Sequence, residues 1–168
     1  MVTFARVALV VFVAIVVQLS FVAPITVLGA RGDVVLLVAI AAGIEAGPER
    51  GAVVGFAAGL TFDLLQAGPA GLSALAYTLV GYAAGTFGSA VLRSSWWIPL
   101  AATVLASALG VVVMALLEAV FGGAPVTVGH LPAIVLVVAA INALLSRPTR
   151  WAVRRALAPP WRDRPSLR

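Results

Sequence analysis

Long apolar runs, separated by short polar or proline-containing segments, follow one another along most of the chain. Six such runs are recognised, and they cover residues 7–29, 34–47, 51–66, 72–92, 98–121 and 131–146. A helix that crosses a bilayer needs about 20 predominantly apolar residues, with a lower limit near 17. The pattern predicts an all-α polytopic membrane protein, a six-transmembrane-helix bundle whose second helix, at residues 34–47, is the shortest.

Composition supports the bilayer as the solvent of this chain. Of its 168 residues, 62% are apolar and only 10% are charged, whereas soluble domains are about 45–50% apolar and about 25% charged. The absence of cysteine excludes disulfides and thiolate chemistry, and a single histidine excludes a multi-histidine metal site. No phosphate-binding loop, nucleophile triad or zinc-hydrolase spacing is present. We therefore expect no enzyme and no cofactor.

The distribution of arginine predicts the orientation. With the N-terminus inside, ten of the eleven cations, all arginine, are cytoplasmic and only Arg31 is outside; positive residues favour the cytoplasmic side. The four tryptophans then share the inner interface, at Trp96, Trp97, Trp151 and Trp161. We expect a membrane protein with both termini cytoplasmic, a transmembrane domain at 1–146 and an arginine-rich tail at 147–168. The net charge of +5 follows from this topology, so no nucleic-acid partner is expected.

Glycines at helical spacing mark the centre of the chain. Gly51, Gly55 and Gly59 recur every four residues, and Gly81 and Gly85 form a second pair. Such small-residue faces let helix backbones approach closely in lipid, where no hydrophobic force drives helices together. Two interpretations are open: packing within this bundle, or a groove for the helix of another protein.

Acidic residues within the apolar runs are the candidate polar sites. Asp63 is predicted near the outer end of the third helix, where it would reach the interface, pair with Arg31, or bind a partner. Together with Glu118 it would instead form a cation or proton site. Glu45 is expected within reach of Arg50 at the inner side.

The start of the tail has the pattern of a basic interfacial helix. Arg147, Arg150 and Arg154 share one helical face, with Trp151 and Arg155 beside them. Such a helix contacts anionic membrane lipid. The alternative is that these arginines only set the topology.

The central stretch resembles the rod shape-determining protein MreD family. The resemblance is carried by Gly55-Phe56, Gly59-Leu60, Asp63-Leu64, Gly71-Leu72, Ala74-Leu75, Tyr77, Gly81-Tyr82 and Gly85. It implies a protein of the bacterial inner membrane, a non-catalytic component of the cell-elongation machinery that scaffolds peptidoglycan synthesis through an MreC-like membrane protein. Through that partner it would act with a RodA-type glycosyltransferase, a penicillin-binding transpeptidase and MreB.

The family resemblance also implies a fold similar to the substrate-binding subunits of energy-coupling-factor vitamin transporters, which gives the alternative function. Those subunits carry an Ala-xxx-Ala face on the first helix. Here the residue four positions after Ala8 is Phe12, and the residue four positions after Ala14 is Gln18, so that face is missing. A third possibility, a proton- or cation-coupled carrier, lacks the repeated halves of such carriers.

Overall fold

The computed structural model describes residues 2–24, 26, 31–66, 70–91, 97–121 and 131–158. Within these ranges the chain is helical and contains no β-strand. The elements, in order, are α1 (Val2–Val17), a π-helical turn η1 (Gln18–Val22), α2 (Val34–Ala46), α3 (Pro48–Leu65), α4 (Leu72–Val91), α5 (Ile98–Val120) and α6 (Leu131–Leu157). The prediction of an all-α fold is confirmed.

Three stretches are long and apolar enough to cross a membrane. They are Thr3–Val22, which comprises α1 and η1, together with α5 and α6. Helix α2 is also apolar but has only 13 residues, which at 1.5 Å per residue is about 20 Å, well short of the ~30 Å hydrocarbon core. These helices identify a membrane protein.

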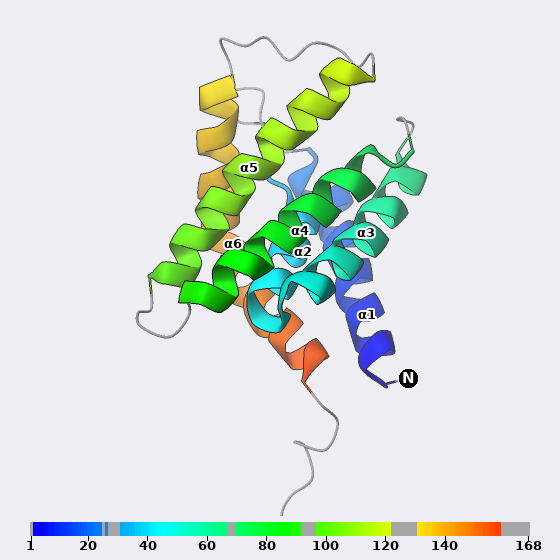
Figure 1. Ribbon diagram of the computed structural model, residues 1–168. Helices are drawn as coiled ribbons and strands as arrows, with labels where there is room; N and C mark the ends of the chain where they lie inside the picture. Colours follow the sequence, from blue (N-terminus) through cyan, green and yellow to red (C-terminus); the bar gives the residue numbers. More distant parts are fainter. Residues whose placement is uncertain are drawn as a thin grey trace, which may run out of the picture.

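Helix α2 is the core of the bundle. All residues from Val34 to Ile44 are buried, and α2 packs against α1, α3, α4, α5 and α6 (Figure 1). A helix that is apolar on every side is suited to such a position. The second apolar run is therefore short because other helices, and not lipid, surround it.

The helices overlap the six predicted runs, but several boundaries differ. With η1 the first helix ends at Val22, short of residue 29, and α3 begins at Pro48, ahead of the run at 51–66. Helix α1 starts at Val2, ahead of the predicted run at 7–29, and α6 continues to Leu157 instead of stopping at residue 146. Pro148 lies inside α6 and would be expected to break it, because it lacks an N–H. The helix nevertheless continues for nine residues beyond Pro148, to Leu157. The first part of the expected tail is thus helical, and residues 159–168 lie outside the described part.

The two ends of the bundle differ in charge. One end of the bundle contains both the α2–α3 junction and the C-terminal part of α6. Among the described side chains, this end holds six arginines: Arg6, Arg50, Arg147, Arg150, Arg154 and Arg155. We call this the arginine end. The opposite end holds Arg31 with Asp33, Asp63 and Glu118. Arg93, Trp96 and Trp161 fall outside the described residues.

Candidate functional site

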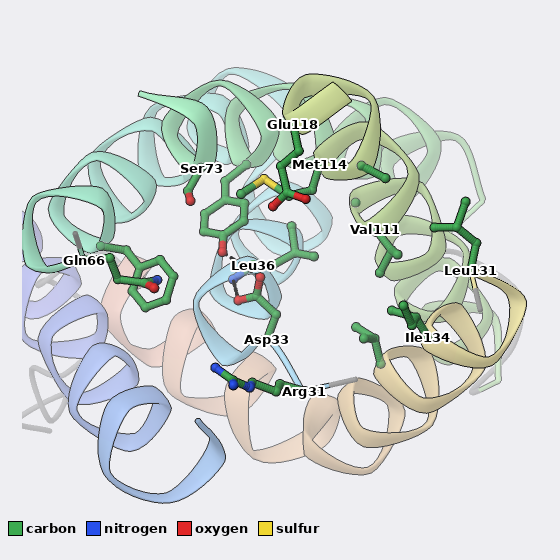
Figure 2. A pocket seen from close by; sticks show the side chains of 15 residues that line it. Arg31, Asp33, Leu36, Gln66, Ser73, Val111, Met114, Glu118, Leu131 and Ile134 are labelled. Atoms are coloured by element: carbon green, nitrogen blue, oxygen red, sulfur yellow. Dashed lines mark hydrogen bonds between the residues drawn. The ribbon is translucent and has the colours of Figure 1, made fainter. Parts of the chain in front are cut away.

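A pocket of about 320 Å³ opens at the end opposite the arginines. Figure 2 shows Arg31 and Asp33 on one side of it and Glu118 with Met114 on another, with Leu131 and Ile134 on the side of α6. The α5 lining runs from Gly110 to Glu118, which is about 12 Å along a helix axis. The pocket is therefore about two helical turns deep.

Asp33 lines the pocket and is the N-cap of α2. Its carboxylate accepts a hydrogen bond of 2.8 Å from the Leu36 N–H, which caps the helix. Its second oxygen accepts a 2.6 Å bond from the Tyr77 hydroxyl of α4.

Amide side chains satisfy the non-helical backbone that leads into α2. The Gln18 side chain donates to the Gly32 carbonyl at 2.9 Å and accepts from the Val34 N–H at 2.8 Å. Asn142 of α6 accepts from the Asp33 N–H at 3.3 Å and donates to the Ser107 hydroxyl of α5 at 3.0 Å. Irregular backbone persists at membrane depth only where protein or a water-filled cavity satisfies it. This network holds in place the backbone of Asp33, which lines the pocket.

Asp63 caps the start of α4. One carboxylate oxygen accepts from the backbone N–H groups of Gly71 at 2.8 Å and Ala74 at 3.2 Å, and the other accepts from Ser73 at 3.3 Å. The side chain is only 7% exposed. A carboxylate is stabilised at a helix N-terminus because unpaired N–H groups and the positive end of the helix dipole meet there. This arrangement differs from the expected pairing of Asp63 with Arg31.

The rim of the pocket carries charges of both signs. Arg31 is exposed and Glu118 is half-buried, and no ion pair joins either of them to another described residue. Glu118 lines the pocket, but Asp63 is not part of the lining. Across the described residues, no three His, Cys, Asp or Glu side chains are grouped so that they could hold a metal ion. The expected pairing of Asp63 with Glu118 as a cation site has no support in this geometry.

The predicted glycine faces lie against neighbouring backbones. A side-chain carbon added at Gly55 would overlap the carbonyl oxygen of Tyr77, and one at Gly59 would lie 2.5 Å from that of Ser73. Gly51 and Gly81 face each other across α3 and α4, and Gly85 faces the backbone of Pro48. The glycine faces of α3 and α4 are thus filled from within the chain.

The basic residues of α6 lie at the arginine end. Arg147, Arg154, Arg155 and Trp151 are exposed, and the Arg155 guanidinium lies 5.4 Å from the centre of the Trp151 ring. Arg150 instead pairs with Glu45 of α2, with a shortest N···O distance of 2.6 Å. The expectation that Glu45 pairs with Arg50 is wrong. Helix α6 packs against α2, and this packing brings Arg150 to Glu45.

Sequence reasoning missed most of the pocket. Gln66, Ser73, Tyr77 and Asp33 line it, yet none was selected as a candidate site residue. The usable signal was that these polar side chains occur near the same predicted ends of different apolar runs. What the sequence does not contain is the distance between those runs.

The fold is that of a helical membrane protein. It has three long apolar helices, a buried central helix and a polar pocket at one end. Comparison with known protein families identifies one family. The chain belongs to the rod shape-determining protein MreD family, whose model matches residues 1–148. It is accordingly a rod-shape-determining membrane component, and the predicted family is confirmed.

No curated protein and no solved structure matches the chain.

Proposed function

We propose that this protein is a non-catalytic scaffold that holds an MreC-like membrane protein and, through it, acts on peptidoglycan synthesis. The observation that carries the proposal is the polar pocket at the end opposite the arginines. Family membership supports work within a complex of shape-determining proteins. RodA-type glycosyltransferase, penicillin-binding transpeptidase and MreB are the proposed indirect partners.

The orientation completes this proposal. Six helices with both termini in the cytoplasm place the arginine end inside, as the positive-inside rule favours, and open the pocket to the outer side. In this arrangement residues 1–146 form the transmembrane domain, and residues 147–168 form a cytoplasmic segment whose first part continues α6.

The charges on the rim are suited to recognition of a polar segment. Arg31 and Glu118 line the same opening without an ion pair to any described residue. A partner that crosses the membrane beside the bundle can place side chains of opposite charge there, from the residues next to its own span. Complementary charges of this kind give specificity and fix register.

The partner's span requires a surface other than the glycine faces, because α3 and α4 cover each other there. The outer sides of these two helices present exposed apolar side chains, namely Val53, Phe56 and Leu64 on α3 and Leu75, Leu79 and Tyr82 on α4. We place the partner's transmembrane helix along this surface, where van der Waals packing drives helix association in lipid.

Co-purification tests the proposal. Tagged protein from native membranes is expected to retain an MreC-like protein, and Arg31→Glu or Glu118→Lys is expected to reduce its recovery at least tenfold. Glu49→Lys is the matched control, because Glu49 is an exposed acid at the arginine end. Recovery of no wall-synthesis protein in repeated experiments would contradict the scaffold.

The pocket also keeps the alternative of a vitamin-binding transporter subunit open, because its volume falls in the range of about 300–1,000 Å³ typical of small-ligand sites. The same purification distinguishes the two functions. Recovery of an ATPase module, together with high-affinity vitamin binding, would favour the transporter subunit.

A further inference from the structure

A second cavity, of about 480 Å³, lies at the side of the bundle between α4 and α5. Its floor is formed by buried residues with small or apolar side chains, including Ile44, Ala84, Gly88 and Ala106. Phe87 and Leu105 also line it and are 68% and 70% exposed. We call this the α4–α5 groove. It exists because α4 and α5 present alanine and glycine to each other, which leaves the space between the helices unfilled.

The lining of the α4–α5 groove excludes water as its occupant. The described residues that line it include no charged, amide or hydroxyl side chain, and among them the indole N–H of Trp97 is the only side-chain hydrogen-bonding group. A water molecule in a cavity needs two to four polar partners. An empty groove is also unfavourable, because the atoms that line it lose their dispersion contacts. A hydrocarbon occupant satisfies both conditions.

The surroundings and the volume point to an acyl chain. Helix α5 is one of the three long apolar helices, and its exposed side chains Leu105 and Leu109 line the groove, so lipid tails are its natural neighbours. A transmembrane helix is about 10 Å across. Little more than one of its turns would occupy the 480 Å³ of the groove. The groove therefore suits a single slender chain better than a helix.

The position of the groove indicates the charge of the lipid. It lies at the arginine end, where Trp97 and the first residues of α5 line it. The same end of the bundle carries the exposed side chains of Arg147, Arg154 and Arg155. Clustered arginines at a membrane surface attract anionic headgroups, and tryptophan is favoured at headgroup depth.

We propose that the α4–α5 groove binds one acyl chain of an anionic phospholipid from the leaflet at the arginine end. This site is independent of the polar pocket, which lies at the other end of the bundle. The lipid acts as a structural ligand that fills the space between α4 and α5.

Thermal unfolding of the full-length protein in detergent, with and without added phosphatidylglycerol, tests the proposal. A ligand that binds only the folded state raises its stability, and we expect the lipid to raise the wild-type Tm by about 5 °C or more. Ala102→Phe fills the groove from α5 and is expected to abolish this rise. Ala108→Phe is the matched control, on the same helix but outside the lining, and is expected to keep it.

Native mass spectrometry gives a second readout: one retained phosphatidylglycerol in the wild type and none in Ala102→Phe. If Ala102→Phe fails to fold, Ala102→Leu replaces it and is expected to reduce both signals. Retention of the rise in the filled variant, its equal loss in Ala108→Phe, or an equal rise with phosphatidylcholine would overturn the proposal. Crosslinking of Leu105→Cys to the span of another protein in native membranes, with no lipid adduct, would assign the groove to a partner helix instead.

Discussion

Asp63 shows how one buried carboxylate organises a helix junction. It is the last buried residue of α3, and its two oxygens accept three backbone N–H groups at the start of α4. Each of these donors would otherwise lack a partner, because the first N–H groups of a helix have no intrahelical acceptor. The acid therefore joins α3 to α4 across a turn.

Removal of this carboxylate tests its role. Asp63→Asn keeps the shape and one acceptor oxygen but places an NH₂ group near a backbone donor, and we expect a loss of about 1–2 kcal/mol in the free energy of unfolding. Asp63→Leu removes both acceptors and is expected to cost about 3 kcal/mol. Thermal unfolding in detergent measures both. Glu118→Gln serves as the control and should change stability by less than about 0.5 kcal/mol; equal stability of Asp63→Asn and the wild type would contradict the capping role.

Gly55 is a residue at which even one methyl group is too large. A Cβ there would overlap the Tyr77 carbonyl oxygen, which belongs to the rigid backbone of α4. We expect Gly55→Ala to destabilise the protein by about 1–3 kcal/mol, and Gly55→Leu by more, because α3 and α4 must separate. Ala57→Leu, on the exposed side of α3, should be tolerated. If Gly55→Leu unfolded at the wild-type temperature, the close packing of α3 on α4 would be disproved.

Among the elements, α6 is a candidate membrane span that also packs against the core at its C-terminal end. Beyond Pro148 it buries Val153 and Ala156 against the core. Val153 and Ala156 line a small hollow together with residues of α1, α2 and α3. The arginine-bearing end of α6 is therefore packed under the bundle on one face, while its other face carries Arg147, Arg154 and Arg155.

The Arg150–Glu45 pair fixes that packing and can be measured. Both side chains are largely buried, with exposures of 22% and 13%, so removal of one partner leaves an uncompensated charge. We expect Arg150→Ala to cost about 1–3 kcal/mol, and the double variant with Glu45→Ala to recover part of that loss. Arg154→Ala, an exposed cation on the same helix, should have little effect. Additive losses in the double variant would show that the pair contributes no coupling energy.

At the scale of the whole molecule, the separation of charge between its ends predicts topology. The chain contains no cysteine, so single cysteines can be introduced without background. An impermeant thiol reagent in intact cells should label Ala70→Cys and should not label Glu49→Cys or Arg154→Cys until the membrane is opened. Labelling of Arg154→Cys in intact cells would reverse the proposed orientation.

Much of this architecture could be predicted from local pattern. The apolar runs located the helices, and the family-like order from Gly55 to Gly85 indicated the family, because both signals depend on residues close in sequence. The enclosure of α2 and the pairing of Arg150 with Glu45 could not be predicted in this way, since they join residues up to 105 positions apart. The α4–α5 groove could not be predicted either, because a run of alanines does not show which space between helices stays unfilled.

The enclosure of α2 also sets the order in which the protein can mature. During synthesis α2 leaves the ribosome before most of the helices that cover it, and the N–H of Asp33, the residue before α2, gains its Asn142 acceptor only 109 residues later. Contacts of such long range form slowly, because the loop between them must close first. A nascent chain that ends before α6 therefore exposes a helix too short for the bilayer and an incomplete polar network. We therefore expect a chain truncated before α6 to accumulate to a lower level in the membrane than the full-length protein.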